Sequence, residues 1–527
     1  MCGLVYLGLG EYSHDQIENV KKSLTHRGPD FFNQRSNSLG EFFFFRLAIM
    51  DPTEKGNQPF SLGNDQLVCN GEIYNYQDLK KKINQSTELI SGSDCEVLLP
   101  SIHEFGFLKT IQSLDAEFAL VYYSEKSNQI LAARDPIGIR PLFYGFNQKG
   151  NICFSSELKS LQGICEKIEP FPPGHIYQNG KFTSYINITT PISYSNDEEE
   201  NIFKQINYHL TKGVHKRLVS DVPLGFLLSG GLDSSLVCAI AQKKLSSPIK
   251  TFSVGMSKDP IDLKYAKEVA EYIGSDHTEI YLDKENVLAS IKDVIWHLES
   301  FDITTIRASI GMYLICKGIR ERTDIKVLLT GEVSDELFGY KYTDFAPSED
   351  EFQKEAKKRV DELYIYDVLR ADRCISAHSI EARVPFSDKN FIEYVMSVHP
   401  KFKMNTTGVG KYLLRKSFEG NNLLPHNILY RDKAAFSDAV GHSLVDELKS
   451  LAEREISDSE FESSRSQYDH APPISKESLY YRRIFDELFP GQAHVIKSYW
   501  MPNSSWENCN VDDPSARVLP NYGKSGN

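Results

Sequence analysis

A glycine-rich segment between a predicted strand and a predicted helix constrains the fold of this chain more than any other feature. Residues 229–235 read SGGLDSS, after an apolar run at 222–228 and before a helical pattern at 234–244. Glycines let a backbone approach a phosphate closely, and the N–H groups that open a helix attract an anion. Asp233 is suited to the divalent metal that accompanies a polyphosphate. The segment lacks the Gly-Lys-Ser/Thr of a Walker A loop, so it predicts another kind of phosphate site. A tight strand–helix turn with an Asp or Ser cap is the alternative.

Further strands alternate with helices in this part of the chain. Apolar runs at residues 250–254 and 326–330 predict a parallel sheet with helices on both faces. Glu332, Asp335 and Glu336 directly follow the second run. Because the carboxyl ends of parallel strands meet at one edge, we expect these carboxylates to converge with the glycine-rich segment. Three carboxylates within five residues are costly to gather without cations; a solvated acidic turn is the alternative.

The first 190 or so residues have a different pattern. Short apolar segments separated by Gly and Pro turns predict many strands, and helical patterns occur near residues 13–24 and 95–105. A chain of 527 residues is too long for one compact unit, and an acidic stretch at residues 189–200 suits a connection between domains. We therefore expect a first domain at 2–190, a linker at 191–205, a second domain at 206–505 and a flexible tail at 506–527.

Charge and cysteine content exclude several classes of protein. The formal net charge is -13, and no long Lys/Arg run is present, so nucleic acid is not an expected partner. The nine cysteines form no CxxC pair, which argues against a zinc ribbon and a disulfide framework and favours a reducing compartment. No signal peptide is recognisable, and no apolar run approaches the roughly 18 residues of a membrane span. The prediction is a soluble cytoplasmic protein without a membrane partner.

Cys2 is a candidate nucleophile. If Met1 is removed, its own free α-amine becomes an intramolecular base; an inert cysteine is the alternative. The segments HRGPD at residues 26–30, RL at 46–47, NGEIYN at 70–75 and GSD at 92–94 accompany it.

Together these segments resemble the N-terminal-nucleophile glutaminase domain of class II amidotransferases, and SGGLDSS resembles the pyrophosphate loop of the N-type ATP pyrophosphatases. A chain with both halves, in this order, resembles the glutamine-hydrolysing asparagine synthetases. The resemblance implies a two-domain α/β and α+β fold. Its N-terminal half is an Ntn-hydrolase αββα sandwich of four layers. Its C-terminal half is a parallel-sheet ATP pyrophosphatase domain, adenine nucleotide α-hydrolase-like, with helical additions.

The resemblance also implies a glutamine site. Cys2 attacks the side-chain amide and forms a thioester, while Asn70 and Gly71 supply the oxyanion hole. Arg46 pairs with the α-carboxylate of glutamine, and Glu72 and Asp94 hold its α-ammonium, since a zwitterion needs both signs of charge for recognition. The implied glutamine-binding residues are Arg46, Leu47, Ala48, Ile49, Met50, Asn70, Gly71, Glu72 and Asp94.

For the second half, the resemblance implies adenylation of L-aspartate by Mg-ATP. The β-carboxylate attacks the α-phosphate, and ammonia from the glutamine site then reaches β-aspartyl-AMP through an internal tunnel. Asp233 and Asp335 hold Mg²⁺, Glu332 accepts a proton at the ammonia step, and Lys433 offsets phosphoryl charge. The implied ATP-binding residues are Leu228, Ser229, Gly230, Gly231, Leu232, Asp233, Ser234, Ser235, Val254, Thr330 and Gly331.

One departure from the family and two other functions stay open. Val333 stands where glycine is common, and a β-branched residue does not easily take a positive φ, so we expect a locally different loop. A related amidotransferase or cyclase would adenylate another carboxylate, whereas a scaffolding protein would keep the fold without binding ATP or glutamine. Family members are often dimers, so by analogy alone a homodimer is a further possibility.

Overall fold

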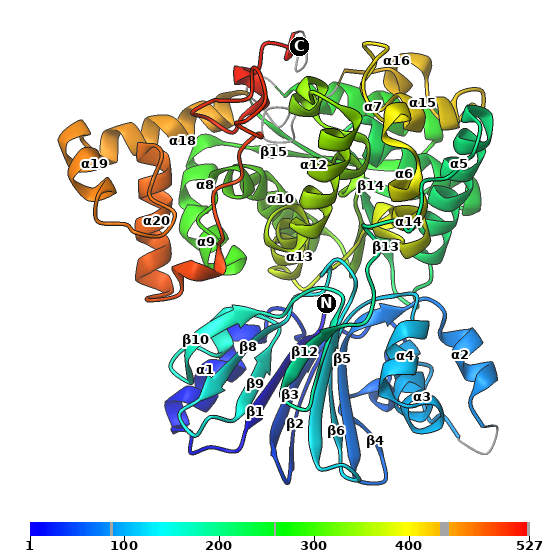
Figure 1. Ribbon diagram of the computed structural model, residues 1–527, viewed down its shortest axis with the longest axis vertical. Coiled ribbons are helices and arrows are strands. Elements are labelled where there is room, and N and C mark those ends of the chain that lie inside the picture. The colour runs from blue at the N-terminus through cyan, green and yellow to red at the C-terminus, as the bar shows by residue number, and fades with distance from the viewer. Residues whose placement is uncertain (85–87, 258–259, 433–441, 524–527) are drawn as a thin grey trace. The chain divides into compact units, whose positions relative to one another are not determined.

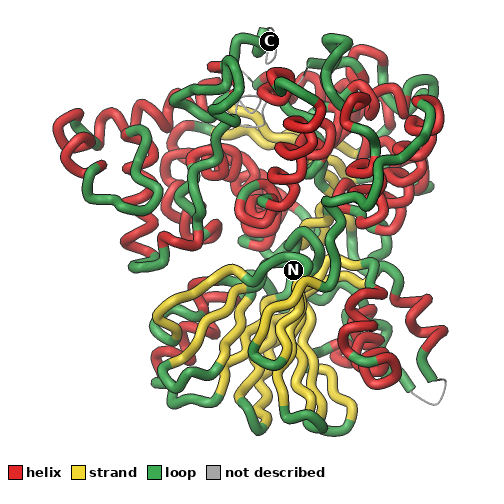
Figure 2. The backbone as a smooth tube through the Cα atoms, viewed as in Figure 1, coloured by secondary structure: helices red, strands yellow, loops and turns green. Residues whose placement is uncertain are grey.

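The structure is a computed structural model that describes residues 1–84, 88–257, 260–432 and 442–523. The chain divides into two compact units. The first comprises Met1–Asn187 with the short segments Val219–Pro223 and Ser376–Glu381. The second comprises Ile188–Leu218, Leu224–Ile375 and Ala382–Asn527. Strands dominate the first unit and helices the second (Figure 2).

Two six-stranded sheets form the centre of the first unit. The strands of one sheet, in spatial order, are β10 (Cys165–Pro170), β8 (Phe143–Asn147), β9 (Ile152–Ser155), β1 (Gly3–Gly8), β3 (Gly40–Arg46) and β2 (Phe31–Asn37). Those of the other are β12 (Lys181–Ser184), β11 (His175–Gln178), β7 (Gln129–Arg134), β6 (Ala116–Ser124), β5 (Asp65–Ile73) and β4 (Phe60–Leu62). Neighbouring strands such as β5 and β6 pair antiparallel, with Val68 opposite Val121.

Alternating side chains explain why the two sheets stack. Successive residues of a strand point to opposite faces. Val68 and Val121 pack between the sheets against Phe42 and Phe44 of β3, whereas Leu67 and its odd-numbered neighbours face the other way. Burial of both faces therefore requires a further layer outside each sheet.

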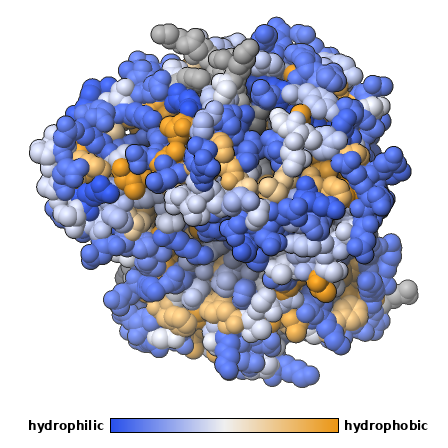
Figure 3. Space-filling model, turned by 45° about the horizontal axis from the view of Figure 1, so that its top comes forward, coloured by the Kyte–Doolittle hydropathy of each residue, from blue (hydrophilic) through white to orange (hydrophobic). Residues whose placement is uncertain are grey.

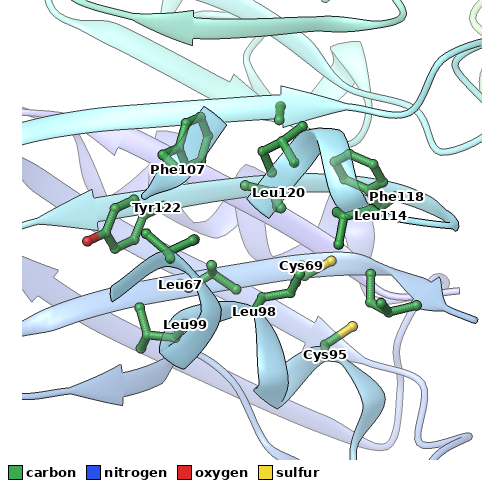
Figure 4. Packing of buried hydrophobic residues seen from close by; sticks show 14 of the residues in the cluster. Leu67, Cys69, Cys95, Leu98, Leu99, Phe107, Leu114, Phe118, Leu120 and Tyr122 are labelled. Atoms are coloured by element: carbon green, nitrogen blue, oxygen red, sulfur yellow. The ribbon is translucent and has the colours of Figure 1, made fainter. Parts of the chain in front are cut away.

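Helices supply these outer layers (Figure 1). Helices α2 (Tyr76–Lys82), α3 (Leu98–Phe105) and α4 (Phe107–Ser113) cover the sheet that contains β5. Leu98, Leu99 and Phe107 pack there against Leu67 and Leu120 (Figure 4). Helix α1 (His14–Leu24) contacts β1 through a face that includes Val20 and Leu24. The predicted αββα sandwich of four layers is confirmed.

The second unit contains the predicted parallel sheet. The spatial order of its strands is β15 (Asp276–Leu282), β14 (Lys250–Met256), β13 (Leu224–Leu227), β16 (Val327–Leu329) and β17 (Glu381–Arg383). β13 pairs in parallel with both β14 and β16, and β14 with β15. The side chains of β16 are completely buried, as expected for a strand covered on both faces.

Helices surround this sheet (Figure 1). Those between its strands are α6 (Leu232–Lys244), α7 (Ile261–Ile273), α8 (Lys284–Ala289), α9 (Ile291–Leu298), α10 (Ile303–Arg322), α11 (Ser334–Phe338), α12 (Glu349–Asp361) and α13 (Asp367–Ser376). The others are α5 (Glu199–Lys216), α14 (Lys389–Ser397), α15 (Tyr412–Phe418), α16 (His426–Leu429), α18 (His442–Glu455), α19 (Asp458–Arg465) and α20 (Lys476–Leu488). These are the expected helical additions.

Two expected boundaries differ from the structure. Residues 199–205, assigned to the linker, already belong to α5, because Glu199 and Glu200 lie in its first turn, where negative charge is favourable. The tail at residues 506–527 was expected to be flexible, but its described part to residue 523 packs into the second unit. Trp506, Cys509 and Leu519 are buried in a cluster with Tyr342 and Phe352.

No helix in the described part of the chain is both long and apolar enough to cross a membrane. Polar side chains cover most of the face in Figure 3, with apolar residues in small patches between them.

Candidate active sites

The thiol of Cys2 lies immediately before β1 and is partly buried. Its Sγ lies 3.7 Å from the carbonyl oxygen of Leu47. Arg27, fully buried, donates from Nε to the carbonyl oxygen of Cys2 at 3.0 Å and from Nη1 to Glu157 at 2.7 Å. Burial raises the pKa of the Cys2 thiol to about 11. Met1 precedes it, and burial lowers the pKa of the Met1 α-amine to about 5. Near pH 7 the thiol thus keeps its proton and the amine has none.

Arg46 ends β3 and holds the loop that follows. Its guanidinium donates to the carbonyl oxygens of Thr53 at 2.6 Å and Met50 at 3.1 Å, and to Oδ1 of Asn57 at 2.7 Å. Asp30 accepts from the backbone N–H of Ala48 at 2.8 Å. Leu47, Ala48, Ile49 and Met50, all predicted to bind glutamine, are buried. Arg46, predicted to pair with the glutamine carboxylate, is thus bonded to protein acceptors here.

Asn70 is the most unusual polar residue of this unit. It is completely buried on β5, and neither Oδ1 nor Nδ2 has a hydrogen-bond partner in the part of the chain that the structure describes. Gly71 follows where strand β6 comes so close that a Cβ would lie 2.4 Å from the carbonyl oxygen of Glu117. Asp94 reaches the end of the same strand, because its Oδ2 accepts from the N–H of Ile73 at 2.6 Å. Glu72 and Asp94 are both buried, so this strand end gathers four of the predicted pocket residues, Asn70, Gly71, Glu72 and Asp94.

In the second unit, the glycine-rich segment forms a tight loop between β13 and α6. Ser234 Oγ accepts from the N–H of Ser229 at 3.2 Å and lies 3.0 Å from Ser229 Oγ. Gly230 has a φ of 70°, and a Cβ there would lie 2.5 Å from the N of Ala266. Gly331 approaches the loop from β16, where a Cβ would lie 2.8 Å from the N of Ser234. The two strand ends therefore converge, as predicted.

Lys411 joins the two carboxylates predicted to bind metal. Its Nζ lies 2.8 Å from both oxygens of Asp233 and 2.6 Å from Oδ1 of Asp335. It also lies 3.0 Å from Oγ of Ser334, which donates to Asp233 at 2.8 Å. Within the described ranges, no three His, Cys, Asp or Glu side chains lie close enough together to hold a metal ion. The group that lies between the two aspartates is the ammonium of Lys411.

A second charged group surrounds Glu332. Arg370 of α13 donates from Nη2 to Glu332 at 2.7 Å and pairs with Asp367 at 2.9 Å. The buried atoms Nε of Arg370 and Oε2 of Glu336 have no hydrogen-bond partner within the described ranges. Burial, reinforced by Asp367 and Asp335, raises the pKa of Glu336 well above its usual range. This cluster offers one cation and three carboxyl groups to a ligand.

One pocket contains both charged groups. The predicted ATP and metal residues that line it are Leu228, Ser229, Gly231, Leu232, Asp233, Ser234, Val254, Thr330, Gly331 and Asp335, with Glu332 alongside. Gly230 and Ser235 are not among the lining residues. Among the described residues, neither the buried Oγ of Ser235 nor Oγ1 of Thr330 has a hydrogen-bond partner. Lys433 lies outside the described residues.

Sequence reasoning missed several basic residues of this pocket, among them Lys411, Arg370 and Arg431. Arg431 pairs with Asp262 at 2.8 Å, and its guanidinium lies 3.8 Å from the ring centre of Tyr265. Asp367 and Arg370 are three residues apart, which places them on one helix face, but many surface pairs share this spacing. Lys411 and Arg431 have no such local signal.

Comparisons with known proteins match both units of the chain. The model of the family "Asparagine synthase" matches residues 205–355 and 344–516, and that of "Glutamine amidotransferase domain" matches residues 1–184. A probable asparagine synthetase [glutamine-hydrolyzing] of Acanthamoeba polyphaga mimivirus is 40% identical over 99% of this chain and 100% of its own length. The asparagine synthetases [glutamine-hydrolyzing] of Zea mays and Homo sapiens are 37% and 38% identical over 99% of this chain, and over 94% and 99% of their own lengths.

Fold, sites and family models thus define a class of protein, a glutamine amidotransferase unit joined to a synthetase unit. Within that class, the chain belongs to the family of glutamine-hydrolysing asparagine synthetases.

Proposed function

We propose that this protein is a carbon–nitrogen ligase that makes asparagine with glutamine as the nitrogen donor. ATP, L-aspartate, L-glutamine and water give AMP, diphosphate, L-asparagine and L-glutamate. Family membership over both units supports this reaction. The observation that carries it most directly is the cation-bridged pair Asp233 and Asp335 beside the glycine-rich loop, at the carboxyl edge of a parallel sheet.

In the glutaminase unit, Cys2 is the proposed nucleophile. Removal of Met1 would give it a free α-amine, which takes the thiol proton as sulfur attacks the glutamine amide carbon. The C–N bond then breaks, ammonia leaves, and water hydrolyses the thioester. The unpartnered side-chain amide of Asn70 is suited to stabilise the oxyanion, together with the N–H of Gly71. The buried carboxylates of Glu72 and Asp94 would hold the α-ammonium, and Arg46 the α-carboxylate.

In the synthetase unit, an oxygen of the aspartate β-carboxylate attacks the α-phosphorus of ATP, and the bond to the β-phosphate breaks. The loop from Ser229 to Ser235 would hold the phosphates, and Leu228, Val254, Thr330 and Gly331 the adenosine. The unpartnered hydroxyl of Thr330 supports a ligand contact there. Ammonia, which we propose passes inside the protein from Cys2, then attacks the acyl carbon, and AMP leaves. Glu332 would accept a proton from the adduct.

Mg²⁺ fits the site of Asp233 and Asp335. This ion is usually held by one or two carboxylates together with substrate phosphates, and these two carboxylates already converge on one cation, the ammonium of Lys411. Bound Mg²⁺ would neutralise phosphate charge. Lys411 would then be released from the aspartates toward the phosphates, and Lys433 remains a further proposed phosphate contact.

Recognition of aspartate requires one cation and at least one anion besides the reacting carboxylate. The unpartnered Nε of Arg370 is suited to the α-carboxylate, and Glu336 with Asp367 to the α-ammonium. A bound ammonium would lower the raised pKa of Glu336, since an opposite charge favours the ionised form.

The proposed setting is cytoplasmic, without nucleic acid as a partner, and the proposed assembly is a homodimer. Light scattering coupled to gel filtration tests the assembly, and a mass of 59.9 kDa in solution would contradict it.

The deciding experiment measures asparagine, AMP and diphosphate from aspartate and Mg-ATP, with glutamine and with ammonium in parallel. We expect product from both nitrogen sources. Product from ammonium alone would show that the synthetase unit is active, and that Met1 has not been removed or Cys2 is inactive. No asparagine from either source, but diphosphate release with another carboxylic acid, would replace aspartate as the substrate.

A further inference from the structure

The C-terminal segment contributes directly to the synthetase pocket. Pro514, Ser515 and Ala516 line it, together with Glu332 and Thr304. The segment was expected to be a flexible tail, yet three of its residues form part of the pocket lining.

Asp513 fastens this segment to the rest of the second unit. Its Oδ1 and Oδ2 accept from Nη1 and Nη2 of Arg307 at 3.0 and 2.9 Å, a fork-to-fork geometry that is the strongest form of this ion pair. Lys449 of α18 lies 2.9 Å from Oδ2, and the N–H of Ser515 donates to Oδ1 at 2.8 Å. These contacts lower the pKa of Asp513 far below its usual range, so the carboxylate is charged at any pH at which the enzyme works.

Arg307 acts as an anchor here. It lies in the first turns of α10, lines the pocket, and is buried. Glu477 of α20 accepts from its Nε at 2.9 Å and from its Nη2 at 2.6 Å. With Asp513, two carboxylates therefore engage both edges of the guanidinium. Because four of the five N–H groups of Arg307 donate to protein carboxylates, its geometry serves to hold the segment in place.

A second attachment lies just beyond the pocket. Ala516 and Leu519 are buried, and Leu519 belongs to the cluster that contains Tyr342 and Phe352. The side-chain amide of Asn521 donates to the carbonyl oxygen of Lys341 at 2.7 Å. Residues 514–516 are thus held on both sides, so they can form a fixed wall of the pocket.

The proposed chemistry requires such a wall. In β-aspartyl-AMP the acyl carbon is activated toward any nucleophile. Attack by ammonia breaks the bond to the AMP oxygen and gives asparagine. Attack by water breaks the same bond, returns aspartate and AMP, releases a proton, and wastes one ATP. A site that excludes water suppresses this side reaction.

We propose that the C-terminal segment is the wall that shields the acyl-adenylate from water, and that Asp513 is the positioning residue that holds it through Arg307. This inference rests on the adenylation proposed above and assigns Asp513 no contact with substrate.

The test compares Asp513→Asn with Asp512→Asn. Both remove one negative charge, but Asp512 is the exposed neighbour. Diphosphate and asparagine are measured together at saturating aspartate, Mg-ATP and ammonium. The wild type and Asp512→Asn should release the two in equal amounts, whereas Asp513→Asn should release at least about twofold more diphosphate than asparagine. A merely structural defect would lower both products and leave their ratio unchanged.

An unchanged ratio in a folded Asp513→Asn overturns the inference, whatever its rate. A wild type that releases no diphosphate would instead be a failure of the proposed function. If Asp513→Asn does not fold, hydrogen exchange of the wild type decides. Backbone amides of residues 511–519 should exchange at least about tenfold more slowly with aspartate and α,β-methylene-ATP than without them, and equal rates would overturn the inference.

Discussion

A single buried polar residue supports the proposed glutamine site more clearly than the Cys2 thiol does. A buried polar atom without a partner is uncommon in folded proteins and calls for an explanation. Asn70 is completely buried, and both polar atoms of its side chain lack a hydrogen-bond partner among the described residues. A ligand oxyanion would satisfy the amide donor, so the cost of leaving Asn70 unpaired is offset when the substrate reacts.

Replacement of Asn70 by alanine should lower glutamine hydrolysis by about 10²–10³-fold, the usual effect of one oxyanion-hole donor. Ammonium-dependent asparagine synthesis should be unchanged, because it does not use this site. The matched control is Asn64→Ala, whose side chain is exposed and bonded to Glu125. Glutamate and asparagine release measured in parallel check both statements, and full hydrolysis by Asn70→Ala would remove Asn70 from the oxyanion hole.

Lys403 should make stability depend on pH. Burial lowers the pKa of its ammonium to about 7, while an unfolded lysine has a pKa near about 10.4. Between these values the unfolded chain holds a proton that the folded chain lacks, so stability is complete above pH about 10.4 and is lost as the pH falls toward 7. The slope is at most about 1.4 kcal/mol per pH unit.

Lys403→Met should therefore be more stable than the wild type at pH 7, with an advantage that shrinks by pH 9. All three tryptophans, Trp296, Trp500 and Trp506, lie in the second unit, so unfolding followed by tryptophan fluorescence reports on this unit. Lys401→Met, at an exposed position in the same turn, is the control. An advantage that does not change with pH would contradict the assignment.

Val333 shows how far local rules reach at this scale. A valine was expected to avoid a positive φ and so to change the loop. Instead, Val333 has a φ of 82°, a value that β-branched residues rarely adopt. Strain of this kind persists where surrounding structure fixes the backbone. Here Val333 precedes α11 and is 1% exposed. The backbone preference of valine alone predicts a negative φ, because it does not include the packing around the residue.

At the scale of elements, the layer between β5, β6 and the helices α3 and α4 stabilises the first unit. Leu120 is completely buried there, with Leu98 and Phe107 in the same cluster (Figure 4). Leu120→Ala should cost about 2–5 kcal/mol, from lost burial and the cavity that remains. Leu108→Ala on α4, where the side chain is 43% exposed, should cost far less.

Thermal loss of glutaminase activity measures this effect, and tryptophan fluorescence supplies the contrast, since every tryptophan lies in the other unit. We expect Leu120→Ala to lose glutaminase activity at a lower temperature. An equal effect of both leucine variants would show that this layer does not carry the stability of the unit.

Apolar runs that begin beside glycines could be predicted from sequence. The strand at residues 3–8 is an apolar run between Gly3 and Gly8, and the helix after the glycine-rich segment begins directly after Gly231. The tail could not be predicted, because Trp506 and Leu519 are buried by Tyr342 and Phe352, which are more than 140 residues away in the chain. A polar composition indicates a loose segment only when no such partners exist. Lys411 was missed for the same reason, since its role depends on two distant aspartates.

At the scale of the whole molecule, two substitutions should separate the two activities. Cys2→Ala should abolish glutamine-dependent asparagine synthesis and leave ammonium-dependent synthesis intact. Asp233→Asn should abolish diphosphate release and leave basal glutamine hydrolysis intact, because its carboxylate belongs to the second unit. Assays of glutamate, diphosphate and asparagine on both variants check the pair. Loss of both activities in either variant would contradict the assignment of one activity to each unit.

The order of segments in the first unit has a consequence for how the protein is made. Residues Ser376–Glu381 belong to that unit, where Ser376 accepts from Nη1 of Arg27 at 3.1 Å and Ser379 donates to the carbonyl oxygen of His26 at 2.8 Å. A ribosome synthesises the chain from its N-terminus. The buried environment of Arg27, which holds Cys2, therefore stays unfinished until translation has passed residue 381. A fragment that stops at the expected boundary near residue 190 lacks these partners, so premature termination leaves the surroundings of Arg27 incomplete.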